Sequence, residues 1–184
     1  APSAGFAQHG GVRAAPAPTV PPEAKQYDYL IGQWELIVKL PPQGLAQRIH
    51  GVPKLAGTWK AWRAFDGFGI EDELSITDAA GNPVGLNHSL RIYDRAARQW
   101  SITGLDVYRA KFLPATAEWK DGAMNQTSRG VDPDGKPYLS RTRIYDITPT
   151  TFRFKQDRSY DEGKSWTEGT LVIEARRVSA VAPR

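Results

Sequence analysis

The chain has 184 residues and no cysteine; 40% of its residues are apolar, and 24 basic against 20 acidic side chains give a formal net charge of +4. This length fits one domain that buries roughly two thirds of its unfolded surface. The absence of cysteine excludes disulfides, thiol catalysis and Cys-type zinc sites. Charges of both signs are interspersed and no apolar stretch reaches about 18 residues, so we expect neither a nucleic-acid partner nor a transmembrane segment.

The first 22 residues differ in composition from the rest of the chain. They are mainly Ala, Gly, Pro and small polar residues, which cannot bury enough surface to offset the entropy of ordering, so we expect residues 1–22 to form a disordered or loosely docked tail. An Ala- and Pro-rich leader often remains after an exported protein is cleaved, which favours a periplasmic or secreted location over a cytosolic one. We place the folded domain at residues 23–178 and a C-terminal tail at 179–184.

A short helix is expected over residues 23–30, and the sequence after it has the pattern of an antiparallel meander. From Thr58 onward apolar residues recur with a period of two, and clusters of Gly, Pro and Asp interrupt them. The predicted strands are 33–40, 56–66, 69–77, 84–93, 99–109, 113–120, 122–130, 137–147, 150–159 and 165–177. Because closing the sheet removes its exposed edges, the sequence predicts an all-β, antiparallel up-and-down barrel of about nine or ten strands, with a sandwich as the alternative.

The segment Tyr27-Asp28-Tyr29-Leu30-Ile31-Gly32-Gln33-Trp34 resembles the opening of an uncharacterised bacterial family of exported, lipocalin-like proteins. Its Gly-x-Trp is also similar to the start of the first strand in lipocalins and other calycins. The resemblance implies a calycin-like barrel in which Trp34 closes the floor and Arg176 or Arg177, from the last strand, packs across its ring as a cation–π pair. It implies no activity, because none is assigned to that family.

A second motif, Ser159-Tyr160-Asp161-Glu162-Gly163-Lys164-Ser165-Trp166, resembles the Asp-box hairpin of sialidase propellers. In such a box the Asp accepts backbone hydrogen bonds, the Gly takes a positive φ and the Trp packs on the sheet. With one copy in a chain of this length, we interpret it as a structural turn and not as part of a sialidase.

Alternate residues of a barrel strand point inward, and the more apolar set is expected to be the inner one. On the early strands this rule places four polar residues inside, where an unpaired charge is costly: Arg63, Asp72, His88 and Asp106. The turn at Gly67 predicts Arg63 opposite Asp72, the next loop predicts Asp72 opposite His88, and Asp106 is then diagonal to His88. We expect the four to share hydrogen bonds.

Apolar residues with a few converging polar groups are typical of a ligand cavity. The candidate ligand-binding residues are Trp59, Arg63, Trp100, Tyr108, Tyr138, Phe152 and Phe154. The later strands add softer polar groups to the interior, namely Gln126, Ser128, Tyr138, Ser140, Thr142 and Gln156. No two histidines share a metal-ligand spacing, so we expect no metal and no cofactor, with haem on His88 as a weaker alternative.

Three functions remain open. The first is an exported binding protein that holds a small apolar or aromatic molecule in the lumen. The second is a lyase, isomerase or hydrolase that uses His88, Asp72, Arg63 and Asp106 for acid–base chemistry. The third is a structural envelope protein whose barrel is packed and holds nothing. The sequence favours the first by analogy of fold and does not indicate the oligomeric state.

Overall fold

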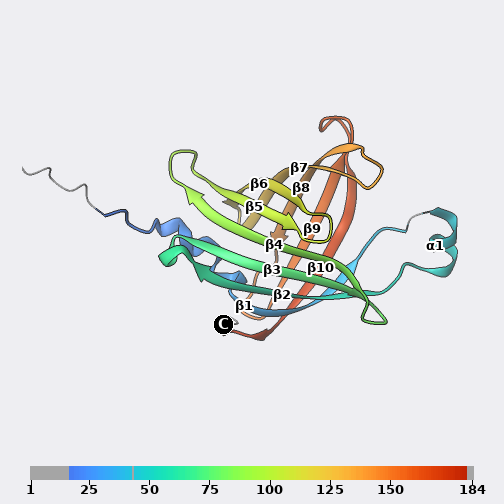
Figure 1. Ribbon diagram of the computed structural model, residues 1–184, viewed down its shortest axis with the longest axis horizontal. Helices are drawn as coiled ribbons and strands as arrows, with labels where there is room; N and C mark the ends of the chain where they lie inside the picture. Colours follow the sequence, from blue (N-terminus) through green and yellow to red (C-terminus); the bar gives the residue numbers. More distant parts are fainter. Residues whose placement is uncertain (1–16, 43, 182–184) are drawn as a thin grey trace, which may run out of the picture.

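Ten antiparallel strands close into one barrel (Figure 1). A computed structural model describes residues 17–42 and 44–181, except for the side chains at positions 44 and 46. Each strand pairs with the next in sequence, and β1 pairs with β10, so the predicted closed barrel is confirmed and the sandwich is wrong. The strands are β1 (Gly32–Lys39), β2 (Leu55–Ala64), β3 (Gly69–Asp78), β4 (Pro83–Asp94), β5 (Gln99–Asp106), β6 (Lys111–Lys120), β7 (Ala123–Val131), β8 (Pro137–Tyr145), β9 (Thr151–Ser159) and β10 (Thr167–Ser179).

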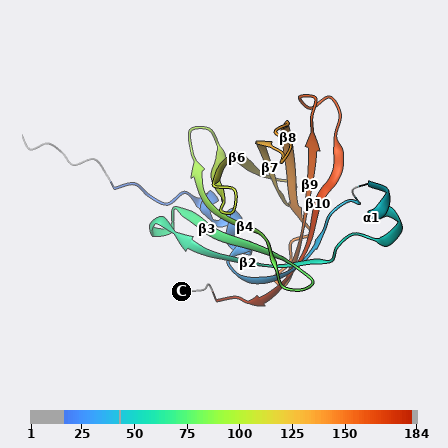
Figure 2. The same ribbon diagram turned by 45° about the vertical axis from the view of Figure 1, so that its right-hand side comes forward.

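Two helices lie at opposite ends of this barrel, as Figures 1 and 2 show. The 3-10 helix η1 (Pro22–Leu30) was predicted over residues 23–30, and it buries Ala24, Tyr27 and Leu30 against the barrel. These residues are three apart because a 3-10 helix turns every three residues. The helix α1 (Gly44–His50), in the connection from β1 to β2, was not predicted, and η2 (Phe65–Gly67) forms the turn between β2 and β3.

The Gly-x-Trp segment closes the end of the barrel beside η1. Trp34 is buried and donates from Nε1 to the Leu30 carbonyl at 2.8 Å. The guanidinium carbon of Arg177 lies 4.1 Å from the centroid of the Trp34 ring, so the predicted cation–π pair is present and Arg177 makes it. Gly32 has a φ of +122°, and a Cβ there would lie 2.4 Å from the Ser179 carbonyl oxygen, which explains why this position is glycine.

The hairpin between β9 and β10 has the structure expected of an Asp-box. Asp161 accepts hydrogen bonds from the Ser165 backbone N–H at 2.9 Å and from the Ser159 hydroxyl at 2.7 Å. Gly163 has a φ of +85°, and Trp166 donates to its carbonyl at 3.1 Å. The hydrogen bonds to the carboxylate lower the pKa of Asp161 to about 2. Each group of the motif therefore holds the turn.

The segment just before η1 is extended, and the Thr19 carbonyl accepts a hydrogen bond from Arg95. Residues 1–16 and 182–184 of the two predicted tails lie outside the described residues. Within the described ranges, the structure contains no helix with the length and apolar character needed to span a membrane.

Candidate functional site

Strand β4 faces the opposite way from the prediction. In the β3–β4 register Asp72 lies opposite Ser89, and His88 lies opposite Glu73. Because a shift of one residue exchanges the two faces of a strand, the inner set is the polar one: Asn87, Ser89, Arg91 and Tyr93. The rule that the more apolar set faces inward, which placed His88 in the lumen, selects the other set of this strand and is wrong here, because that set points outward: Leu86, His88, Leu90 and Ile92.

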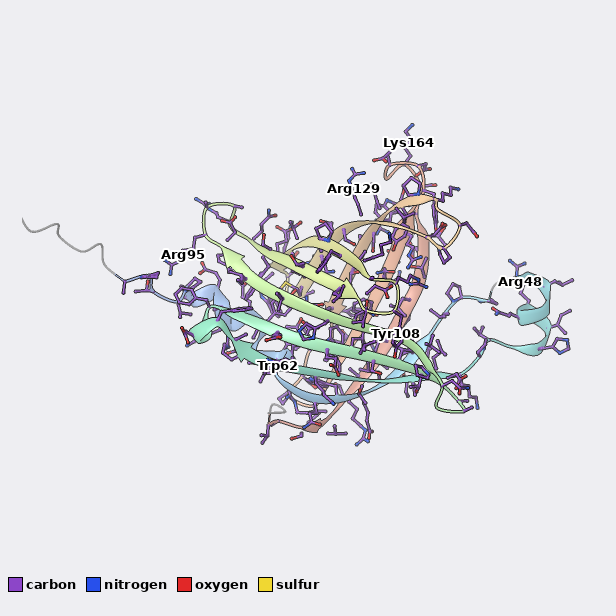
Figure 3. All side chains as sticks on the ribbon, viewed as in Figure 1. Arg48, Trp62, Arg95, Tyr108, Arg129 and Lys164 are labelled. Atoms are coloured by element: carbon purple, nitrogen blue, oxygen red, sulfur yellow. The ribbon has the colours of Figure 1, made fainter. Side chains whose placement is uncertain are left out.

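His88 is therefore on the outer wall of the barrel. Its Nε2 lies 2.8 Å from Glu71 Oε1, and its ring centroid is 6.0 Å from that of Trp62. Figure 3 shows Trp62 on the β2 side of the molecule. The predicted position of His88 inside the lumen is wrong, and so is its predicted contact with Asp72.

The other members of the predicted acid–base cluster are also apart. Arg63 lies opposite Ile70 in the register, donates to the Ala24 carbonyl at 2.8 Å and forms an ion pair with Asp28, so it fastens η1 to the barrel. Asp106, at the end of β5, is paired with Arg109 at 2.8 Å. Each of the four residues has a different partner, so they do not form the predicted cluster: Arg63, Asp72, His88 and Asp106.

Asp72 is buried inside the barrel, and its cation is Arg91. Arg91 Nε lies 2.5 Å from Asp72 Oδ2, and Trp59 Nε1 donates to Asp72 Oδ1 at 2.8 Å. Burial is the largest single effect on the pKa of Arg91 and would lower it, but the charge and hydrogen bond of Asp72, together with Tyr27 and Tyr29, outweigh burial and raise that pKa. Arg91 also donates to the hydroxyl of Tyr27, whose pKa is raised by burial. The network joins η1, β2, β3 and β4, and its carboxylate is satisfied.

The predicted ligand-binding aromatic residues divide into three groups. Four of them are buried and belong to the packed core near η1: Trp59, Trp100, Phe152 and Phe154. Tyr108 is 55% exposed on the turn after β5 (Figure 3). Tyr138 is half-buried on the inner face of β8, at the end of the barrel away from η1. Of this set, Tyr138 is the residue positioned at an accessible part of the interior.

Burial of the inward-facing side chains falls along β2 to β10 with distance from η1, whereas on β1 Val38, which is far from η1, is still buried. Beside η1 they are buried, and toward the other end most are half-buried, so solvent reaches them, with Ser140 as a buried exception. We call this second region the open half, and it consists of Leu74, Ile76, Asn87, Ser89, Gly104, Leu113, Ala115, Gln126, Ser128, Tyr138, Ser140, Gln156, Arg158 and Leu171. Five of these residues were predicted to face inward from the alternation on the later strands: Gln126, Ser128, Tyr138, Ser140 and Gln156.

Small residues line one wall of the open half. Ser89 lies opposite Gly104 across β4 and β5, and Ser128 lies between Ala115 and Ser140 across β6, β7 and β8. A Cβ at Gly104 would make only ordinary contacts, with the nearest atom 3.5 Å away. Side chains this short extend less far into the barrel than the aromatic residues beside η1.

Two groups in the open half lack a full set of partners among the described residues. The Ser140 side chain is 3% exposed, and its hydroxyl has no hydrogen-bond partner among the described residues. Arg158 lies directly opposite Ser140 in the β8–β9 register, with its guanidinium carbon 4.3 Å from the Tyr138 ring centroid. Sequence reasoning did not select Arg158, although it continues the inward alternation of Phe152, Phe154 and Gln156.

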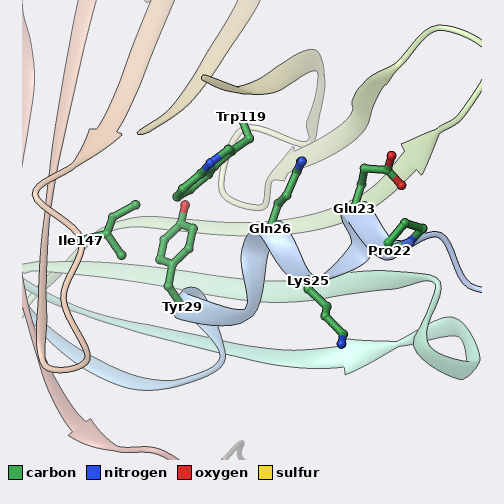
Figure 4. Close-up of a pocket in the computed structure, with 7 residues that line it drawn as sticks. All are labelled: Pro22, Glu23, Lys25, Gln26, Tyr29, Trp119 and Ile147. Atoms are coloured by element: carbon green, nitrogen blue, oxygen red, sulfur yellow. The ribbon is translucent and has the colours of Figure 1, made fainter. Parts of the chain in front are cut away.

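Depressions lie outside the lumen, and two of them are relevant to ligand binding. One, of about 540 Å³, runs between η1 and the barrel, with Tyr29, Trp119, Gln26 and Ile147 among its lining residues (Figure 4). The Tyr29 hydroxyl is buried without a hydrogen-bond partner among the described residues, but it points at the Trp119 ring, which covers it. The other, of about 770 Å³, lies on the outer wall over β4 to β8 and includes Leu90, Ile92, Thr103 and Leu139.

The described residues contain no group of three or more His, Cys, Asp or Glu side chains that could hold a metal ion.

The closed ten-stranded antiparallel architecture is that of a lipocalin-like barrel. Among solved structures, an S-type phycobiliprotein lyase from Guillardia theta is similar to this chain, with a TM-score of 0.54 and 10% sequence identity over 83% of this chain and 90% of that one. At this identity the likeness concerns the fold. Neither a known family nor a curated protein matches the sequence.

Proposed function

We propose that this protein is an exported, periplasmic or secreted, member of a bacterial lipocalin-like family, and that it binds a small, largely apolar molecule in the open half of its barrel. The observation that carries the binding proposal is the Ser140 hydroxyl, which is buried on the inner face without a partner among the described residues. Burying a hydroxyl that makes no hydrogen bond costs about 1–3 kcal/mol, which a bound ligand would offset. The resemblance of residues 27–34 to the opening of an exported family supports the proposed location.

The shape of the interior favours binding over the other two hypotheses. A structural barrel filled by its own side chains would bury the inner face at both ends, whereas here the open half is half-exposed. Acid–base chemistry would need its four proposed residues in one cluster, but each of them has a separate partner: His88, Asp72, Arg63 and Asp106. The solved neighbour is a lyase, and one barrel fold can support either binding or chemistry, so the site and not the fold decides.

Filling the open half tests the proposal. The probe is N-phenyl-1-naphthylamine, a neutral aromatic molecule whose fluorescence rises in an apolar site, titrated into wild type and into Gly104→Leu. A Cβ fits at Gly104 and the rest of the leucine projects into the lumen, so we expect the variant to fold and to bind the probe at least about tenfold more weakly.

Thr103→Leu is the matched control, because Thr103 is on the same strand but faces outward and lines the outer depression. Binding that is lost in Gly104→Leu and retained in Thr103→Leu places the probe in the lumen. Loss in Thr103→Leu alone would assign binding to the outer wall and overturn the proposal, as would a wild type that does not bind the probe.

A further inference from the structure

Arg158 differs from the other arginines on the inner face of the barrel. Arg63 is paired with Asp28, Arg91 with Asp72, and Arg177 donates to backbone carbonyls. Arg158 has no carboxylate within 4.0 Å among the described residues. Its hydrogen bond runs from Nε to the amide oxygen of Gln156 at 3.3 Å.

The neighbourhood orients this cation without neutralising it. The guanidinium lies over the Tyr138 ring, a contact that holds the side chain and leaves its terminal N–H groups free of an anion. By contrast Arg141, next to Ser140 in sequence but facing outward, is paired with Asp157 at 2.9 Å. The β8–β9 pair therefore carries a paired arginine, Arg141 of β8, on its outer face, and Arg158 of β9, which has no carboxylate partner among the described residues, on its inner face.

Ser140 adds a second donor at the same place. Ser140 lies directly opposite Arg158, and directly opposed residues in an antiparallel pair have Cβ atoms about 4.5–5.5 Å apart, so the two side chains start from neighbouring positions on the same inner wall. A hydroxyl can donate to an anionic oxygen, and a guanidinium fork matches the two oxygens of a carboxylate. Apolar side chains of the open half, including Leu74 and Leu171, lie on other strands of the same lumen.

We propose that the ligand of the open half is an amphipathic anion, an apolar body with a carboxylate-type head whose oxygens accept hydrogen bonds from Arg158 and Ser140. This inference rests on the proposed function and names the class of its ligand. The neutral part of the ligand accounts for binding in the lumen, and the anionic head accounts for the unpaired arginine and the unpaired hydroxyl.

The test compares two probes with one scaffold. N-phenyl-1-naphthylamine is neutral, and 8-anilino-1-naphthalenesulfonate adds one anionic group that stands in for the carboxylate. We expect wild type to bind the anionic probe more tightly, and Arg158→Gln to weaken the anionic probe about tenfold while leaving the dissociation constant of the neutral probe unchanged. Ser140→Ala should weaken the anionic probe by a smaller factor, and Arg158→Lys should retain part of the difference because it keeps the charge.

Arg129→Gln is the matched control, since Arg129 is an exposed arginine on the outer wall paired with Glu162. It should change neither probe. Suppose that Arg158→Gln leaves the ratio of the two dissociation constants unchanged, while Gly104→Leu still abolishes binding. The proposed function then stands, and the anionic ligand is wrong. Arg158→Lys replaces Arg158→Gln in this comparison if the glutamine variant fails to fold. If Gly104→Leu leaves both probes bound, or wild type binds neither, the proposed function fails and this inference fails with it.

Discussion

The Asp72 carboxylate has two donors inside the barrel, and one of them carries a full charge. Removing Arg91 would leave a buried carboxylate with a single neutral donor, the Trp59 indole. We expect Arg91→Met to lower the free energy of unfolding by about 3–5 kcal/mol, as is typical when one partner of a buried ion pair is deleted. Urea denaturation at neutral pH measures this loss.

The control for this prediction is the double variant that combines Asp72→Asn with Arg91→Met. The amide is neutral and can still accept from Trp59, so the double variant should be more stable than Arg91→Met alone. A double variant that loses the sum of the two single effects would show that the pair does not interact energetically.

Among the elements, β4 shows why face assignment from sequence failed. Leu86, Leu90 and Ile92 form a regular apolar set, and the rule that the apolar face is the inner one selects them. The inner face instead carries Arg91, which Asp72 requires, and Ser89, which lines the open half. Strand positions and the helix before β1 were predictable from alternation and turn residues, because these signals are local. The register between strands depends on packing across the barrel, and the sequence of a single strand carries no information about that packing.

The β9–β10 hairpin allows a prediction of pH dependence. The pKa of Asp161 is lowered to about 2 in the folded state, below an unfolded value of about 3.9, so its charged form stabilises the fold. That contribution is fully present above about pH 4 and is lost as the pH falls through about 2. Asp161→Ala should therefore be less stable than wild type at pH 6, with a difference that shrinks between pH 4 and pH 2 in urea titrations. A difference that stays constant over this range would mean that the Asp161 charge does not hold the turn.

At the scale of the whole barrel, the position of the candidate site depends on which end of the lumen is packed. The sequence does not show this directly. The aromatic residues proposed as ligand contacts, such as Trp100 and Phe152, are the large side chains that fill the end beside η1. The inward alternation on β7 to β9 did place Ser140 and Gln156 correctly, and one further step along β9 reaches Arg158. A large aromatic residue closes a barrel as readily as it binds a ligand, so residue type alone selected the packed end, whereas small and polar inward residues mark the open one.

A ligand held between strands from all around the barrel stabilises the closed structure as a unit, because the unfolded chain offers no such site. At a free concentration of about 100 times its dissociation constant, a probe bound only to the native state adds about 2.7 kcal/mol to the free energy of unfolding. For a chain of this size that corresponds to a rise in Tm of about 5–10 °C. Differential scanning calorimetry with N-phenyl-1-naphthylamine should show this rise for wild type and Thr103→Leu, and at most about half of it for Gly104→Leu, because a tenfold weaker site adds about 1.4 kcal/mol at the same probe concentration. An equal rise in all three proteins would place the binding site outside the lumen, where the side chain at position 104 cannot reach it.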